Sequence, residues 1–337
     1  MAKDKQDIVI GLSVIICTYN RAELLKNVLQ DVCEQTLADS EFEVIVVDNH
    51  STDQTRAVAE SFCQRYANVR YCFEAQQGLS HARNRGWREA RGEYLAYLDD
   101  DCQVPTQWLA VAKGIIELQA PIVFGGPYYT FYNSPKPHWW KEKYDAYHSM
   151  EYADSAGYLK TQQDIHGCNL FIQKTILQNV GGFEPHFGMS GNRLGYGEET
   201  ELQMRIFKAL PSPRAYYDPR LYVDHLVAAK KMTIGWVTRA HIAHGRAAYH
   251  LCPRNLMRFG LVINCLWRFV ELPKNIIIVF FSLVFKRDRS QHLYWQNDLY
   301  ESHRFREGCC GMLGFLYECV TTSLSTLFRH KPDKMSR

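Results

Sequence analysis

Three adjacent carboxylates, Asp99, Asp100 and Asp101, follow an apolar run in the stretch YLAYLDDDCQVP, residues 94–105. Like charges in a row repel one another, so this run predicts a positively charged partner. In extended chain, residues i and i+2 point to the same side, roughly 6.6 Å apart. We therefore expect Asp99 and Asp101 to converge on one object, while Asp100 points elsewhere.

The chemistry that suits this motif is that of a hard divalent cation. A small number of carboxylate oxygens fits Mn²⁺ or Mg²⁺, which share their coordination shell with phosphates. Such an ion neutralises the charge that develops when a phosphate leaves. A solvated acidic turn, or the acidic first turn of a helix, is the plainer alternative. The chain has no Walker loop and no GxGxxG turn, which disfavours P-loop and dinucleotide-binding folds.

The scaffold that must position these carboxylates is predicted from the first 130 residues. Short apolar runs rich in β-branched residues are expected to be buried parallel strands, at 12–17, 43–47, 69–73 and 93–98. Repeated β-α-β units imply a parallel sheet flanked by helices. Because the crossovers are right-handed, the strand carboxyl ends share one edge, where ligands of open α/β sheets bind.

Helices are expected between these strands. Residues 22–35 place apolar side chains at helical spacing. A second helix is predicted around Val58 and Phe62, with Ser51 or Thr52 as its N-cap. The polar residues that follow the strands therefore gather at the ligand-binding edge.

Six motifs occur in the order and spacing of a known family. They are CTYNR (17–21), VVDNHSTDQT (46–55), GLSHARNRG (78–86), LDDD (98–101), GCNLFIQKTILQNVGGF (167–183) and GYGEETELQMRI (195–206). Over about residues 10–250, the chain resembles the family 2 glycosyltransferases, inverting enzymes of the GT-A fold that use nucleotide-sugar donors. The resemblance implies an α/β fold with a mostly parallel central sheet flanked by helices.

This resemblance implies nucleotide contacts for Thr18, Tyr19, Arg21, Asp48 and Arg83. The first three would pack against the nucleoside. Asp48 would accept the imide N–H of the base, a hydrogen bond that a carboxylate can make. Arg83 would contact the base or the diphosphate, with Arg85 as its competitor. For Asp48, a simple turn cap is the alternative.

The resemblance also implies the metal ligands and the catalytic base. Asp99 matches a position near the ribose and the metal, Asp101 matches the direct metal ligand, and His225 adds a third ligand. An inverting transfer needs one carboxylate to take the proton of the attacking hydroxyl. Glu199 maps to that base, and Glu198 would bind acceptor hydroxyls. Since the family pattern is Glu-Asp and this chain has Glu-Glu, the choice between the two stays open.

Two regions are expected along the chain. A GT-A catalytic domain would span 1–250, with a nucleotide-binding half (8–125) and an acceptor half (126–250), followed by a helical region at 251–337. Apolar blocks at 276–285 and 308–328 are bordered by basic clusters, which suits helices lying on the cytoplasmic face of a membrane. Core helices or a dimer interface are the alternatives.

Composition narrows the class of protein. The chain has 337 residues, is 46% hydrophobic and carries a net charge of +3, which predicts a folded protein that does not bind nucleic acid. The N-terminus lacks a signal-peptide pattern, so we expect a cytoplasmic protein, peripheral at the inner face of the cell membrane. Eleven cysteines without a CxxC pair predict free thiols rather than a zinc site.

These observations predict an inverting, metal-dependent glycosyltransferase. It would move a sugar from a nucleotide-diphospho-sugar, with UDP as the expected nucleotide, to a hydroxyl of a glycan or lipid-linked acceptor in surface polysaccharide biosynthesis. A nucleotidyltransferase acting on sugar phosphates is one alternative, although CTYNR lacks the glycines of such enzymes. A non-catalytic binding module is the other. The sugar, the linkage and the oligomeric state stay open.

Overall fold

The computed structural model describes residues 11–137, 140, 144–145, 148–161, 163–211, 214–251, 313–314 and 317–318. The chain divides into two compact units. The first unit comprises Met1–Pro135, Lys141–Arg193 and Glu198–Ala228, and the second comprises Lys136–Trp140, Leu194–Gly197 and Ala229–Arg337. The first unit contains the sheet and all the predicted site residues.

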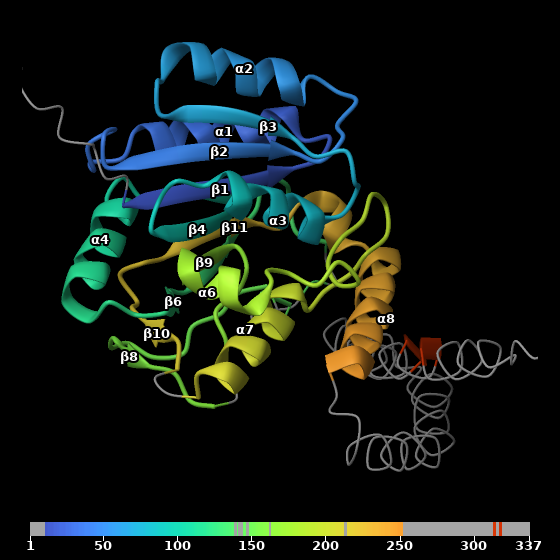
Figure 1. Ribbon diagram of the computed structural model, residues 1–337. Helices are drawn as coiled ribbons and strands as arrows, with labels where there is room; N and C mark the ends of the chain where they lie inside the picture. The colour runs from blue at the N-terminus through green and yellow to red at the C-terminus, as the bar shows by residue number, and fades with distance from the viewer. Residues whose placement is uncertain are drawn as a thin grey trace, which may run out of the picture. The chain divides into compact units, whose positions relative to one another are not determined.

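An eight-stranded sheet, in the order β3-β2-β1-β4-β9-β6-β10-β8, forms the centre of the first unit (Figure 1). Its strands are β1 (Leu12–Thr18), β2 (Phe42–Asp48), β3 (Val69–Phe73), β4 (Tyr94–Asp99), β6 (Val123–Gly125), β8 (Gly157–Tyr158), β9 (Asn169–Gln173) and β10 (Tyr216–Tyr217). The first four strands of the chain pair in parallel, whereas β9 runs antiparallel between β4 and β6. The four predicted strands are confirmed, with ends shifted by one residue at most.

Helices cover both faces of this sheet. They are α1 (Ala22–Cys33), α2 (Thr55–Arg65), α3 (Leu79–Glu89), α4 (Trp108–Gln119), α6 (Lys174–Val180) and α7 (Glu198–Ala209). A smaller sheet has the order β5 (Cys102–Gln103), β11 (Val223–Leu226) and β7 (Tyr128–Phe131). The predicted α/β fold with helices flanking a central sheet is therefore confirmed.

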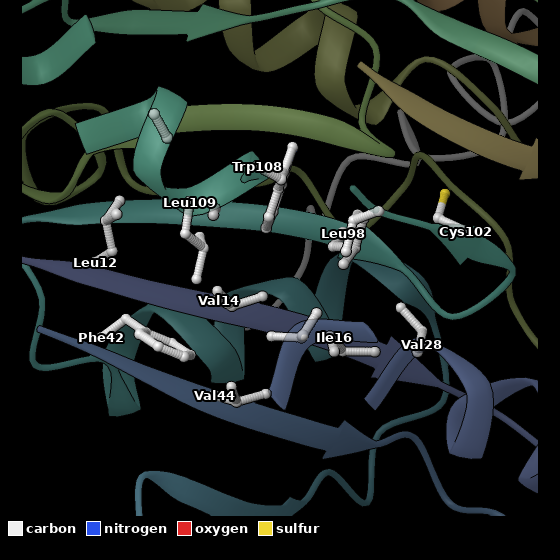
Figure 2. Close-up of a cluster of buried hydrophobic side chains, with 14 of the residues drawn as sticks. Leu12, Val14, Ile16, Val28, Phe42, Val44, Leu98, Cys102, Trp108 and Leu109 are labelled. Carbon is white, nitrogen blue, oxygen red and sulfur yellow. The ribbon is translucent and has the colours of Figure 1, made fainter. Parts of the chain in front are cut away.

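Two apolar clusters hold the helices on the sheet. Side chains alternate between the two faces of a strand, so β1 supplies Val14 and Ile16 to one cluster and Ile15 to the other. Helices α1, α2 and α4 pack on the first cluster, part of which is shown in Figure 2. Helices α3, α6 and α7 pack on the second. Cys102 and Cys168 are buried free thiols of the first cluster, as expected for core cysteines.

The predicted cap of the second helix is wrong. Helix α2 begins at Thr55, and neither Ser51 nor Thr52 caps it. Asp53 accepts the backbone N–H of Thr55 instead, at 2.9 Å. The backbone N–H of Ser51 donates to Asp48 Oδ1 at 2.8 Å. Ser51 thus donates to the carboxylate at the end of β2 and does not cap the helix. Asp53 accepts the N–H of the first helical residue instead, because it is closer to that residue along the chain.

The second unit contains a 3₁₀ turn (Ala229–Met232) and α8 (Ile234–Leu251). Within it, Glu318 accepts a hydrogen bond from Arg246 Nε of α8 at 2.5 Å. The apolar block at 276–285 lies outside the described residues, and only four residues of the block at 308–328 are described. In the described part of the chain, no helix combines the length and the apolar character that crossing a bilayer requires.

Two glycines test how closely the first unit is packed. A Cβ on Gly126, between β6 and β7, would collide with the carbonyl oxygens of Leu221 and Asp218. A Cβ on Gly114, inside α4, would meet no atom within 4 Å.

We expect Gly126→Ala to lower the free energy of unfolding by about 1–3 kcal/mol through overpacking. Gly114→Ala should raise it by about 0.5–1 kcal/mol, because alanine favours the helix. Urea unfolding of both variants measures this, and shifts of the same sign would contradict the packing described here.

Candidate active site

The ends of three parallel strands bring three predicted site residues to one edge of the sheet. Thr18 at the end of β1 is level with Asp48 of β2, and the preceding residue, Cys17, is level with Asp99 of β4. Thr18 and Asp48 are almost fully buried. This edge is the one at which open α/β sheets bind ligands.

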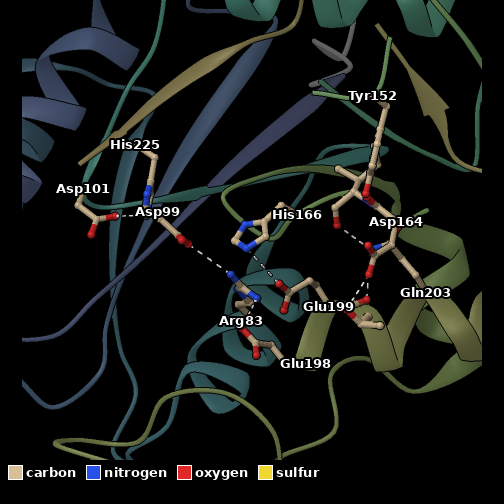
Figure 3. A network of polar contacts seen from close by, with 12 residues as sticks. Arg83, Asp99, Asp101, Tyr152, Asp164, His166, Glu198, Glu199, Gln203 and His225 are labelled. Carbon is tan, nitrogen blue, oxygen red and sulfur yellow. Dashed lines mark hydrogen bonds and ion pairs between the residues drawn. The ribbon is translucent and has the colours of Figure 1, made fainter. Parts of the chain in front are cut away.

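Asp99, Asp101 and His225 form a cluster at this edge. One ligand atom from each side chain lies within 4.8 Å of those of the other two. Asp99 ends β4, Asp101 lies in the following turn, and His225 comes from β11 (Figure 3). His225 Nε2 is 3.3 Å from Asp101 Oδ1. The first and third carboxylates converge as predicted, but through a turn after β4 rather than through the extended chain that the prediction assumed. Two carboxylates with one imidazole could hold a divalent metal ion.

The middle carboxylate, Asp100, has a cation of its own. Arg21 Nη1 lies 2.6 Å from Asp100 Oδ1 and 3.2 Å from Asp101 Oδ2. Burial raises the pKa of the Asp100 carboxyl, and the guanidinium opposes that rise. The protein itself therefore supplies part of the positive charge that the acidic run requires, through Arg21. The guanidinium of Arg21, which was expected at the nucleoside, lies against the acidic run.

Arg83 is a buried cation that joins the two ends of the site. The residue is 2% exposed. Its Nη2 lies 3.3 Å from Asp99 Oδ1, and its Nη1 lies 2.9 Å from Glu198 Oε1. A Cβ on Gly167 would come within 2.6 Å of Nη2, so only glycine leaves room for the guanidinium there. Arg83 therefore connects Asp99 of the candidate metal site with Glu198 of α7. The guanidinium nitrogens that were expected to face the nucleotide contact these two carboxyl groups instead.

Glu198 and Glu199 lie side by side in the first turn of α7, yet their environments differ. Burial raises the pKa of Glu198 to about 8, and the charge of Glu199 adds to the rise while Arg83 opposes it. Burial also acts to raise the pKa of Glu199, but His166 and Arg83 outweigh it and hold this pKa below its ordinary value. Among the described residues, Glu199 Oε2 has no hydrogen-bond partner. Glu198 Oε2 is likewise buried without a partner among these residues. The two glutamates therefore differ in the direction of their pKa shifts, which favours the ionised form of Glu199 and the protonated form of Glu198.

His166 and Tyr71 are site residues that the sequence did not reveal. His166 Nε2 lies 3.7 Å from Glu199 Oε1. The position of His166, directly before the GCNLF motif, was the one signal that could have drawn attention to it. The hydroxyl of Tyr71, on β3, donates to Asp48 Oδ2 at 2.9 Å. No local pattern could predict that contact, because it depends on the pairing of β2 with β3.

Comparison with known sequences finds similarity to sugar transferases. A model described as glycosyl transferase family 2 matches residues 13–181, half of the chain. Glycosyltransferase AglE of Haloferax volcanii is 34% identical over 185 residues, which cover 54% of this chain and 58% of AglE. The glucosyl-dolichyl phosphate glucuronosyltransferase of the same organism is 23% identical over 229 residues, covering 67% and 72% of the two chains.

Comparison with solved structures supports the fold. The mannosyltransferase PcManGT from Pyrobaculum calidifontis, in complex with GDP-Man and Mn²⁺, superposes with a TM-score of 0.59 at 18% identity, covering 91% of this chain and 86% of that one. S. aureus TarS 1–349 gives a TM-score of 0.51 at 17% identity, covering 69% and 65%. At such identities the likeness concerns the fold alone, and it confirms the GT-A architecture.

Metal binding by Asp99, Asp101 and His225 can be tested without any assay of activity. Asp101→Asn removes a charged ligand, so we expect it to weaken Mn²⁺ binding at least tenfold, measured by the electron paramagnetic resonance signal of free Mn²⁺. Asp224→Asn is the matched control, because Asp224 neighbours His225 on β11 and points to the opposite face of the strand. Equal affinity for Mn²⁺ in wild type and Asp101→Asn would exclude Asp101 as a ligand.

Proposed function

The chain belongs to glycosyltransferase family 2, and from this premise we propose that it is an inverting, divalent-metal-dependent enzyme. It moves a sugar from a nucleotide-diphospho-sugar to a hydroxyl of a glycan or lipid-linked acceptor. The observation that carries this proposal is the buried Glu199 in the first turn of α7, whose pKa His166 and Arg83 hold below its ordinary value. Through Arg83 and Glu198, this carboxylate shares one site with Asp99 and the metal cluster.

The donor side of the site is formed by the strand ends. Asp48 is anchored by Ser51 and Tyr71, which donate to one oxygen each. A carboxylate fixed in this way can accept the imide N–H of a uracil, so UDP is the nucleotide that we propose. Thr18, at the end of β1, lies level with Asp48, and Tyr19 follows it; both would line the nucleoside site. This half corresponds to the proposed nucleotide-binding half, 8–125.

The leaving-group side is formed by Asp99, Asp101 and His225. These residues would hold the metal ion, which stabilises the charge of the departing diphosphate. The imidazole favours Mn²⁺ over Mg²⁺, because Mg²⁺ prefers oxygen ligands only. Arg21 supports this side by neutralising Asp100, so that the repulsion within the acidic run does not displace the ligands.

The acceptor side is formed by the first turn of α7. Glu199 takes the proton of the acceptor hydroxyl as that oxygen attacks the anomeric carbon. Its lowered pKa keeps it unprotonated at neutral pH, as a base must be. Glu198 is mostly protonated at neutral pH, since its pKa is about 8. It can therefore donate a hydrogen bond to an acceptor oxygen.

Glu199→Gln tests the assignment of the base. Glutamine keeps the size of the side chain and its hydrogen bonding but cannot take the proton. We expect kcat to fall by about 10²–10⁴-fold while the donor still binds. Glu201→Gln is the matched control, because Glu201 lies in the same helical turn but pairs with Arg205 at 2.6 Å.

The assay follows release of the nucleoside diphosphate with Mn²⁺ over a panel of donors and acceptors. An inactive Glu198→Gln beside an active Glu199→Gln would exchange the two roles. Release of pyrophosphate in place of the nucleoside diphosphate would indicate nucleotidyl transfer. Binding of UDP without any turnover would indicate a binding module.

A lipid-linked acceptor and a peripheral membrane location complete the proposal. One relative is a glucosyl-dolichyl phosphate glucuronosyltransferase, which by its name acts on a lipid-linked sugar. The basic clusters at 286–289, 303–306 and 329–331 border the apolar blocks of the C-terminal region. Each Lys or Arg near an anionic leaflet contributes about 1 kcal/mol to binding. Attachment at the inner face of the cell membrane would place the acceptor half, 126–250, near its substrate for surface polysaccharide biosynthesis.

Vesicle sedimentation tests the location. We expect the full-length protein to sediment with phosphatidylglycerol vesicles and to be released by detergent. Replacing Arg304 and Arg306 by glutamate should weaken binding at least tenfold, because two attractive charges become repulsive. Lys208→Glu, on the exposed end of α7, is the control and should change nothing. Full retention in the supernatant at low salt would contradict membrane attachment.

A further inference from the structure

His166 and Glu199 face each other across the acceptor side of the site. The imidazole Nε2 lies 3.7 Å from Glu199 Oε1 (Figure 3). The His166 side chain is 42% exposed, whereas that of Glu199 is 12% exposed. The imidazole therefore borders space in which a ligand can lie, and the carboxylate is reached from that side.

The segment that carries His166 is fastened to the helix that carries Glu199. Thr200 Oγ1 donates to Asp164 Oδ2 at 2.6 Å. Gln203 holds both polar groups of the Ile165 backbone, accepting from the N–H at 2.9 Å and donating to the carbonyl at 2.7 Å. Gln203 is 1% exposed, so water does not compete for these bonds. The two residues before His166 are thus bound to α7, and this fixes His166 opposite Glu199.

The imidazole ring of His166 also packs on an aromatic ring. Its centroid lies 4.6 Å from that of Tyr128, with an angle of 39° between the rings. Tyr128 is 7% exposed and meets the ring of His225 edge-on at 6.0 Å. Packing on a buried aromatic ring restricts the ring of His166 to few orientations. The geometry is that of a side chain held in place to act on its neighbour.

The remaining charges around Glu199 do not replace this contact. Arg83 approaches from α3, but its guanidinium donates hydrogen bonds to Asp99 and Glu198. Asp164, on the segment before β9, is acidic and repels the carboxylate. Glu198, whose own pKa is raised to about 8, donates a hydrogen bond that helps to lower the pKa of Glu199. The charge of His166 has the largest effect in holding the pKa of Glu199 down, and Arg83 follows it.

On the basis of the proposed glycosyltransferase function, we propose that His166 is a positioning residue for the base Glu199. It orients the Glu199 carboxylate toward the acceptor hydroxyl and keeps that carboxylate ionised until it takes the proton. No bond to His166 forms or breaks in the transfer. Its contribution is to hold the carboxylate in the reactive geometry, where a displacement of about 1 Å can cost 10²-fold in rate.

Two variants and a matched control separate this role from a structural one. His166→Ala removes the imidazole, and His166→Gln keeps a hydrogen-bond donor without a positive charge. His186→Ala is the control, because His186 also faces a glutamate, Glu184, at 4.0 Å, but is 89% exposed on the surface. For each variant, kcat, the KM of donor and acceptor, the pH profile of kcat, the affinity for Mn²⁺ and the thermal unfolding midpoint are measured.

We expect His166→Ala to lower kcat by about 10–100-fold with little change in the KM of the donor. His166→Gln should recover part of this loss. Burial acts to lower the pKa of His166, but Cys168, Glu199 and Asp99 outweigh it and raise this pKa to about 10, so the imidazole is charged at neutral pH. Without that charge the pKa of Glu199 rises, so the acid limb of the kcat profile moves to higher pH in both variants. The affinity for Mn²⁺ and the unfolding midpoint should stay at their wild-type values, and His186→Ala should match the wild type in every measurement.

Three results would overturn the proposal. The first is a wild-type kcat and acid limb in His166→Ala, while Glu199→Gln is inactive. The second is a loss of Mn²⁺ affinity parallel to the loss of kcat, which would assign the effect to His225 through Tyr128. The third is a lowered unfolding midpoint that accounts for the lost activity. A wild-type protein that transfers no sugar would instead refute the proposed function itself, so the two failures are distinguishable.

Discussion

The buried guanidinium of Arg83 is the interaction on which the rest of the site depends. A charge removed from water costs several kcal/mol unless close opposite charges compensate it. Arg83 is 2% exposed; it pairs with Asp99 at 3.3 Å and donates a hydrogen bond to Glu198 at 2.9 Å. Loss of Asp99 would leave the buried charge without this ion pair, and loss of Glu198 would leave a buried donor without this acceptor. The end of β4 and the start of α7 are thereby fixed relative to each other.

The excess of acidic side chains in the site also sets its affinity for cations and the protonation states of its glutamates. Carboxylates outnumber the arginines, and Arg21 and Arg83 neutralise only part of their charge. The remaining negative charge lies at Asp99 and Asp101, beside His225, and a divalent cation would complement it. Along α7, two adjacent acids cannot both ionise freely. The pKa of Glu198 rises to about 8 and that of Glu199 falls. Neighbouring residues of one type thus acquire different protonation states.

The reversal of chain direction at β9 brings the two parts of the site together. Because β9 runs antiparallel to β4, its first residue, Asn169, lies level with Leu98 at the end of β4. The residues just before β9 therefore reach the edge at which the acidic run lies. They include Gly167, which leaves room for Arg83, and His166, which faces Glu199. A parallel strand in that position would have carried them to the opposite edge of the sheet.

What the sequence by itself determined is local. The β-branched runs predicted the parallel strands, and the run of three acids predicted that Asp99 and Asp101 converge, because such patterns lie within a few residues. Tertiary structure decided which cation meets which carboxylate: Arg21 reaches Asp100 across 79 positions and Arg83 reaches Glu198 across 115. Those pairings depend on strand order and on the direction of β9, and no periodic pattern of residues in the sequence encodes either of them. For the same reason the role of Ser51 was mispredicted, since the carboxylate that accepts its N–H belongs to the end of a strand and not to the helix that follows.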